Sequence, residues 1–169
     1  MRIRTEQPKD FDLIYNFVKE AFFTAKVSDG TEQDFVNQLR GSDGYIPELA
    51  LLVEEGGELI GHIMLTRRKI KTEQGEVPVL LLAPVAVRLD KRGQGIGSIL
   101  MEEALGRARR LGHQAVFLVG EPKYYSRFGF KQADIYGVSC TRPIPSEFVQ
   151  ALELVSGGLS GASGTINLE

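Results

Sequence analysis

One glycine-rich turn limits the possible folds of this chain more than any other segment. It reads Arg-Gly-Gln-Gly-Ile-Gly-Ser over 92–98, after the apolar run Val77–Val87 and at the start of the helical pattern Ile96–Leu111. Glycines let several backbone N–H groups converge without side-chain clashes. The first N–H groups of a helix lack internal acceptors and lie at the positive end of its dipole. The segment therefore predicts a buried strand, a turn that binds phosphate or pyrophosphate, and a helix.

Three phosphate-binding patterns compete for this turn. A P-loop requires a Gly-Lys-Ser/Thr ending, which is missing here. A dinucleotide-binding Gly-x-Gly-x-x-Gly pattern requires glycine where Ser98 stands. The third pattern, Arg/Gln-x-x-Gly-x-Gly/Ala, is met by Arg92, Gly95 and Gly97. On these residues alone, a purely structural role for the glycines in a tight strand-to-helix turn stays open.

With this turn, and with Val85-Ala86-Val87 at the end of the preceding run, the chain resembles the GCN5-related N-acetyltransferase (GNAT) family. The resemblance covers about residues 1–141. Gly61-His62-Ile63 and the segment 124–130 make it similar to the bacterial YhbS-like predicted acetyltransferases. It implies an α/β (mixed α+β) acyl-CoA N-acyltransferase fold, with a central mixed, mostly antiparallel sheet flanked by helices and splayed at the cofactor-binding strand.

The resemblance also implies acetyl-CoA as cosubstrate, held mainly by backbone groups. The residues expected to bind it are Val85, Ala86, Val87, Arg92, Gly93, Gln94, Gly95, Ile96, Gly97, Ser98, Tyr125 and Arg127. For Arg127 the alternative is a role in capping the end of a short helix.

The resemblance assigns the general acid to Tyr125, which lies four residues before Gly129 as does a tyrosine near the coenzyme sulfur in the family. Tyr124 is the alternative, because consecutive residues of a short helix cannot both face the cofactor. A base is also needed, since a lysine amine with a pKa of about 10.4 is almost wholly protonated at pH 7. The strand run carries no carboxylate, so Glu121 and His62 are the tentative bases. A buried structural role is the alternative for His62.

The remaining patterns predict the other elements and the domain organisation. The chain is expected to comprise a GNAT domain over 1–141 and a C-terminal extension, 142–169, packed on or continuing the same domain. Within the extension, Ser146–Leu154 has helical spacing. The other expected elements are strands Arg2–Thr5, Leu49–Glu54, Leu59–Arg68 and Ala115–Val119 and helices starting at Pro8, Thr31 and Lys123. The turn Glu55-Gly56-Gly57-Glu58 predicts a hairpin between the second and third of these strands.

Composition limits the partners. A formal net charge of −2 argues against a nucleic-acid binder, and no apolar run is long enough to span a membrane. One cysteine and two histidines offer no zinc-ligand spacing, and a single cysteine favours a reducing, cytoplasmic location. We expect a monomer or homodimer without a metal.

The sequence predicts an acyltransferase that moves acetyl from acetyl-CoA to a primary amine by direct attack in a ternary complex. The acceptor, a small-molecule amine or a protein or peptide amine, is left open. The alternatives are a non-catalytic acetyl-CoA-binding or protein-interaction module on the same fold, and another nucleotide-binding enzyme.

Overall fold

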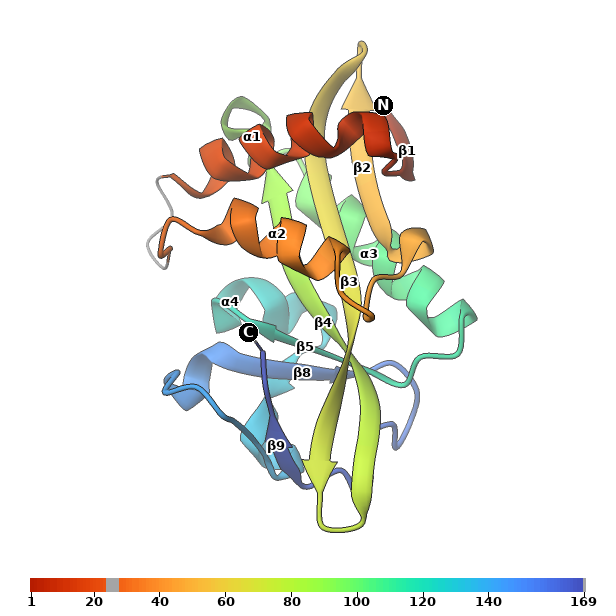
Figure 1. The fold of residues 1–169 in the computed structure, drawn as a ribbon, viewed down its shortest axis with the longest axis vertical. Coiled ribbons are helices and arrows are strands. Elements are labelled where there is room, and N and C mark those ends of the chain that lie inside the picture. Colours follow the sequence, from red (N-terminus) through yellow and green to blue (C-terminus); the bar gives the residue numbers. More distant parts are fainter. Residues whose placement is uncertain (24–27, 169) are drawn as a thin grey trace. The chain divides into compact units, whose positions relative to one another are not determined.

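The computed structural model describes residues 1–23 and 28–168 and contains two compact units (Figure 1). The first unit comprises Met1–Thr66 and Ala83–Arg107, and the second comprises Arg67–Leu82 and Ala108–Glu169. Two long strands, β3 (Glu58–Thr72) and β4 (Gly75–Val87), contribute residues to both units.

The other elements are four α-helices and seven strands of the described residues. The helices are α1 (Phe11–Phe22), α2 (Glu32–Arg40), α3 (Ile96–Arg110) and α4 (Pro122–Tyr125). The other strands are β1 (Arg2–Thr5), β2 (Ala50–Glu55), β5 (Ala115–Val119), β6 (Lys131–Gln132), β7 (Val138–Cys140), β8 (Val149–Glu153) and β9 (Gly164–Ile166).

In the first unit, strands β1, β2, β3 and β4 are neighbours in that order. β1 and β3 both pair antiparallel with β2. The hairpin predicted between β2 and β3 is confirmed, because Glu55 pairs with Glu58 across Gly56 and Gly57. Both glycines have positive φ, 60° and 79°, which suits a tight two-residue hairpin.

Helices cover both faces of this part of the sheet. A Cβ placed on Gly61 of β3 would lie 2.9 Å from Cδ1 of Leu100, so α3 packs closely on that face. The side chain of the next residue, His62, points to the opposite face because side chains alternate along a strand. There it belongs to a cluster that includes Arg40 of α2, and α1 packs against α2.

In the second unit, β4 pairs parallel with β5 through Leu80 with Val116 and Leu81 with Phe117. β8 pairs antiparallel with β5 and with β6, and β9 pairs antiparallel with β3 and parallel with β7. The expectation of a mixed, mostly antiparallel sheet flanked by helices is therefore confirmed. The splay at the cofactor-binding strand stays a prediction.

The helix predicted from the spacing in Ser146–Leu154 is wrong. Ser146–Phe148 is a single 3-10 turn, and Val149–Glu153 forms β8 between β5 and β6. Residues 149–152 are all buried, so the apolar spacing reflects a strand covered on both faces. The segment after residue 141 thus supplies β8 and β9, and the domain boundary at 141/142 stays a prediction.

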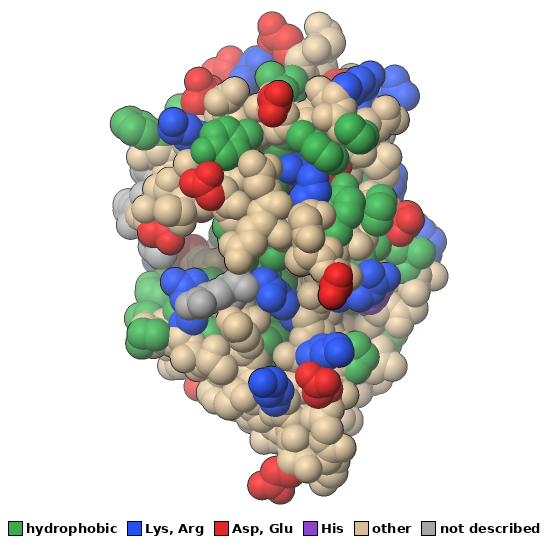
Figure 2. Space-filling view, in the orientation of Figure 1, with side chains coloured by type: hydrophobic (Ala, Val, Ile, Leu, Met, Phe, Trp, Pro, Cys, Tyr) green, Lys and Arg blue, Asp and Glu red, His purple; other side chains and the backbone are tan. Residues whose placement is uncertain are grey.

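Charged side chains of both signs are interspersed on the face shown in Figure 2. Within 1–23 and 28–168, no helix has the length and apolar character needed to cross a membrane. The expected absence of nucleic-acid partners and the cytoplasmic location stay predictions.

Candidate active site

The glycine-rich turn lies where the sequence predicts it, between the end of β4 and the start of α3. Gly93 and Gly95 adopt φ values of 77° and 83°. In this left-handed region a side chain costs about 1–2 kcal/mol, so glycine is favoured at both positions. The two glycines turn the backbone so that consecutive N–H groups precede the helix.

Six consecutive backbone N–H groups, in the glycine-rich turn and the first turn of α3, have no partner within the described part of the chain. Among the described residues, the N–H groups of residues 93–98 have no hydrogen-bond acceptor. The helical ladder begins one residue later, where the Ile99 N–H donates to the Gly95 carbonyl at 3.0 Å. Free N–H groups at the positive end of a helix dipole form an anion site. We call residues 93–98 the amide cradle.

The basic side chains beside the amide cradle are already engaged by protein acceptors. Arg88 lies 2.7 Å from both Glu58 and Asp90 oxygens, and Lys91 lies 3.1 Å from a Glu55 oxygen. Positive potential at the cradle therefore comes mainly from oriented backbone dipoles.

Arg92, a predicted cofactor-binding residue, also contacts the protein. Its Nη2 donates to the Ala21 carbonyl in the last turn of α1 at 2.6 Å, and its Nε donates to the Val87 carbonyl at 3.3 Å. A cation at a helix C-terminus is favourable because the dipole is negative there. In this arrangement the guanidinium ties the turn to α1 and to the end of β4.

The predicted pantetheine-binding stretch, residues 85–87, forms the end of β4. Ala86 is buried, whereas Val85 and Val87 are partly exposed. The Arg88 N–H donates to the Ile60 carbonyl at 2.9 Å and so closes the pairing with β3. The stretch thus leads directly into the amide cradle within the first unit.

Tyr125 ends α4 in the second unit and is half-buried. Its ring packs edge-on against Tyr124, with centroids 4.9 Å apart, and against Phe130, with centroids 6.0 Å apart. Its hydroxyl has no hydrogen-bond partner within the part of the chain that the structure describes. Burial raises the pKa of Tyr125 above its usual value, and Tyr124 adds to the effect. Tyr125 is therefore a protonated donor for which the described residues provide no acceptor.

The other predicted residues around α4 lie on its surface. Arg127 donates from Nε to the Tyr124 carbonyl at 3.1 Å, and its guanidinium lies 4.4 Å above the Tyr124 ring. These contacts favour the helix-capping alternative for Arg127. Glu121 is exposed at the N-cap position of α4, where its side chain makes no capping hydrogen bond.

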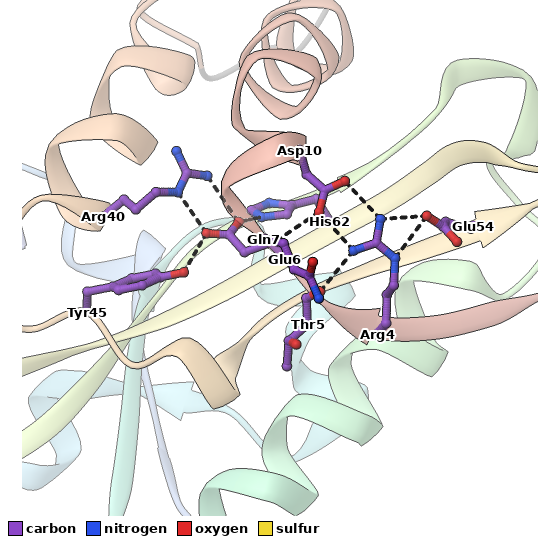
Figure 3. Close-up of polar contacts among 9 residues, drawn as sticks. All are labelled: Arg4, Thr5, Glu6, Gln7, Asp10, Arg40, Tyr45, Glu54 and His62. Atoms are coloured by element: carbon purple, nitrogen blue, oxygen red, sulfur yellow. Dashed lines mark hydrogen bonds and ion pairs between the residues drawn. The ribbon is translucent and has the colours of Figure 1, made fainter.

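His62 lies in a buried cluster around Glu6 (Figure 3), which we call the Glu6 cluster: Glu6, Arg40, Tyr45 and His62. Glu6 Oε1 accepts from Arg40 Nη2 at 3.0 Å and lies 2.9 Å from His62 Nε2. Glu6 Oε2 accepts from Arg40 Nε and from the Tyr45 hydroxyl, both at 2.7 Å. The side chains of Glu6 and His62 have no exposed surface.

Hydrogen bonding keeps Glu6 ionised in this cluster. Burial alone would raise the pKa of Glu6, but hydrogen bonds from His62, Arg40 and Tyr45 and the nearby positive charge lower it to about 2. An ionised carboxylate only accepts hydrogen bonds, so Nε2 of His62 carries the hydrogen of this contact. The burial and this contact disfavour His62 as a base that takes a proton from a substrate.

The predicted residues fall into two groups. Residues 85–87, the amide cradle, Arg92 and His62 lie in the first unit, whereas Glu121, Tyr125 and Arg127 lie in the second. Sequence reasoning missed Glu6, Arg40 and Tyr45, which lie 17 to 56 positions from His62 and share no local motif with it. Across the described part of the chain, no group of three or more His, Cys, Asp or Glu side chains is placed to hold a metal ion.

Known proteins are similar to this chain in both sequence and fold. The family model of the acetyltransferase (GNAT) domain matches residues 2–133. The uncharacterized N-acetyltransferase YhbS of Escherichia coli is 29% identical over 166 residues, which cover 98% of this chain and 95% of YhbS. The uncharacterized N-acetyltransferase YjhQ of Escherichia coli is 36% identical over 117 residues. That stretch covers 69% of this chain and 65%, less than two thirds, of YjhQ.

Solved structures agree with these sequence matches. The crystal structure of Escherichia coli YhbS in complex with CoA superposes with a TM-score of 0.85 at 27% identity, covering 99% of this chain and 89% of that one. A GNAT family acetyltransferase from Brucella melitensis in complex with acetyl-CoA gives a TM-score of 0.74 at 30% identity, covering 90% and 86%. The chain therefore belongs to the GNAT acetyltransferase family and has its fold, as the glycine-rich turn predicts.

Proposed function

We propose that this protein transfers the acetyl group of acetyl-CoA to a primary amine by direct attack in a ternary complex. The observation that carries the proposal is the amide cradle, in which six consecutive N–H groups have no acceptor among the described residues. The YhbS and Brucella melitensis relatives, whose structures contain CoA and acetyl-CoA, support the choice of cofactor.

In this proposal the donor is held mainly by backbone groups. The pyrophosphate binds the amide cradle, and the pantetheine arm follows residues 85–87 of β4. Hydrogen bonds to a charged acceptor contribute about 1.5–3 kcal/mol each, so a few cradle contacts are enough to dominate the affinity. Arg92 supports the cradle through the Ala21 and Val87 carbonyls.

Tyr125 is proposed to assist departure of the coenzyme thiolate. Its pKa is raised by burial, so the phenol stays protonated at neutral pH. A thiol has an ordinary pKa of about 8.5, below the value of about 10 for a phenol. Complete proton transfer from Tyr125 to the thiolate is therefore uphill, and a hydrogen bond that strengthens as charge develops is the favoured form of assistance.

The proton lost by the amine requires an acceptor. Glu121 is the better of the two proposed bases because its side chain is exposed, whereas His62 is enclosed in the Glu6 cluster. A water molecule between amine and carboxylate would serve the same purpose.

A turnover screen tests the proposal. Acetyl-CoA and the protein are incubated with polyamines, aminoglycosides, amino acids and peptides with free N-termini, and free coenzyme A is measured. We expect acetylation of at least one amine class and binding of coenzyme A by calorimetry. Binding of CoA with no turnover across the panel would favour the non-catalytic module. Tight binding of NAD or ATP, with none of CoA, would contradict the proposal.

Replacement of Gly95 by alanine tests the amide cradle. At a φ of 83° the added Cβ strains the backbone by about 1–2 kcal/mol although the space around it is open. The turn relaxes by rotating its N–H groups, and loss of one contact to a phosphate raises the Kd for coenzyme A about tenfold. Calorimetric titration with coenzyme A measures this change.

Gly112 supplies the matched control for this substitution. It also has positive φ, 88°, with open space where a Cβ would be added, but it follows α3 rather than preceding it. Gly112→Ala should lower the melting temperature as Gly95→Ala does and leave the Kd unchanged. Equal Kd values for the two variants would contradict the role of the cradle.

A further inference from the structure

A glycine at the end of β5 has a packing requirement that its backbone conformation does not explain. A Cβ placed on Gly120 would lie 2.5 Å from Cε2 and 3.2 Å from Cδ2 of Tyr125. The φ of Gly120 lies outside the left-handed region, so any residue could adopt this backbone. The ring of Tyr125 therefore rests directly on the glycine, and only a hydrogen fits beneath it.

The backbone of Gly120 is held on both sides. Its N–H donates to the Phe148 carbonyl at 2.9 Å. Its carbonyl accepts from Nε2 of Gln150 at 2.7 Å. Gln150 is only 2% exposed and lies opposite Leu118 in the pairing of β5 with β8. Because the backbone is fixed, an added methyl group must displace the ring rather than the strand.

Helix α4, which follows Gly120 in the chain, carries Tyr125 and places its ring against Gly120. The N–H of Tyr125 donates to the Glu121 carbonyl at 3.3 Å, and edge contacts with Tyr124 and Phe130 hold the ring laterally. Its hydroxyl is left without a partner among the described residues. The ring is thus in contact with Gly120 on one side and with Tyr124 and Phe130 at its edges. The hydroxyl, which the proposed chemistry uses, keeps no partner among the residues that the structure describes.

We propose that Gly120 is a positioning residue for Tyr125 and that Gln150 locks Gly120 in place. We call Gly120 and Gln150 the tyrosine seat. The proposal rests on the proposed function, because the seat matters to catalysis only if Tyr125 assists the leaving thiolate. It also gives β8, in the segment after residue 141, a part in the reaction without any contact to substrate. A displacement of about 1 Å in a reacting group can cost about 100-fold in rate.

The test uses the full chain labelled with 3-fluorotyrosine and observed by ¹⁹F NMR. The chain has five tyrosines, and Tyr125→Phe assigns the Tyr125 signal by its loss. Gly120→Ala should shift that signal and lower kcat about 10- to 100-fold, with the best amine of the panel, while the Kd for coenzyme A stays within about twofold. Adding Tyr125→Phe to Gly120→Ala should cause no further loss than Tyr125→Phe alone.

Two further variants keep the test decisive. Gln150→Leu removes the donor to the Gly120 carbonyl without adding volume at the seat, and should shift the same signal if Gly120→Ala fails to fold. Gly61→Ala is the control for crowding, since its Cβ would meet Leu100 Cδ1 at 2.9 Å. It should lower the melting temperature but leave the Tyr125 signal in place.

The outcomes separate the seat from the proposed function. An unshifted Tyr125 signal in both Gly120→Ala and Gln150→Leu would overturn the seat. A shifted signal with full kcat in both Gly120→Ala and Tyr125→Phe would support the seat and instead overturn the role proposed for Tyr125. A large rise in the Kd for coenzyme A alone, with kcat unchanged, would also contradict positioning of Tyr125.

Discussion

Tyr125→Phe is expected to lower kcat for acetyl transfer about 100-fold or more, because removing one hydrogen-bond donor to a developing anion typically costs about 100- to 1,000-fold in kcat. The substitution removes one oxygen that has no hydrogen-bond partner in the described part of the chain, so it breaks no other interaction. The ring keeps its packing against Tyr124 and Phe130. Steady-state kinetics with the best amine of the panel, together with calorimetry for coenzyme A, measure kcat and Kd separately.

The neighbouring tyrosine is the matched control. Tyr124→Phe makes the same chemical change one residue earlier on α4 and should leave kcat within a few-fold. If activity falls in Tyr124→Phe and persists in Tyr125→Phe, the hydrogen-bond donor to the thiolate is Tyr124 and not Tyr125. Because the pKa of Tyr125 is raised, the profile of kcat against pH should show no loss from its ionisation below about pH 10.

Glu6→Gln is expected to lower the free energy of unfolding by about 3–5 kcal/mol, the usual cost of removing one partner from a buried ion pair. Arg40 is left with its charge at a side-chain exposure of 8%. The new amide NH₂ also faces donors from Arg40, His62 and Tyr45, which the carboxylate had accepted. The chain has no tryptophan, so urea unfolding followed by far-UV circular dichroism measures the change.

The pH dependence of stability distinguishes loss of the Glu6 charge from a packing defect in Glu6→Gln. The folded pKa of Glu6 is lowered to about 2, so its stabilisation is complete above the unfolded value near 4.5 and is lost as pH falls through about 2. The difference in unfolding free energy between wild type and Glu6→Gln should therefore shrink steadily from pH 5 to pH 2. A difference that stays constant over this range would show that the carboxylate charge is not the cause.

Glu54→Gln is the control for a more exposed ion pair. Glu54 lies 2.6 Å from Arg4, but its side chain is 26% exposed, and solvent screens the pair. The loss of stability should be much smaller than for Glu6→Gln.

The strands and helices that were predicted correctly depend on neighbours in sequence. The start of α3 at Ile96 and the hairpin at Gly56 and Gly57 follow from a few consecutive residues. Glycine conformation, helix periodicity and turn chemistry act over such short distances. The family assignment rests on the same contiguous segment, and matching sequences and structures confirm it.

β8 is an element that local sequence patterns predicted wrongly. Phe148 and Leu152 stand at helical spacing, yet Val149–Glu153 is a strand because β5 and β6 offer backbone partners on both sides. Pairing between strands whose residues lie 18 to 38 positions apart in the sequence outweighs a weak local periodicity. For the same reason, the sequence assigned no role to Gln150, whose partner is the Gly120 carbonyl.

The glycine-rich turn and its family were thus determined by the sequence alone, because an anion site made of backbone N–H groups needs only local conformation. The surroundings of the catalytic candidates were decided by tertiary structure. His62 is enclosed by Glu6, which directly follows β1, and by Arg40 of α2, and the Tyr125 ring packs on Gly120. Burial, ion pairing and steric fit depend on which distant residues the fold brings together, and no short segment encodes them.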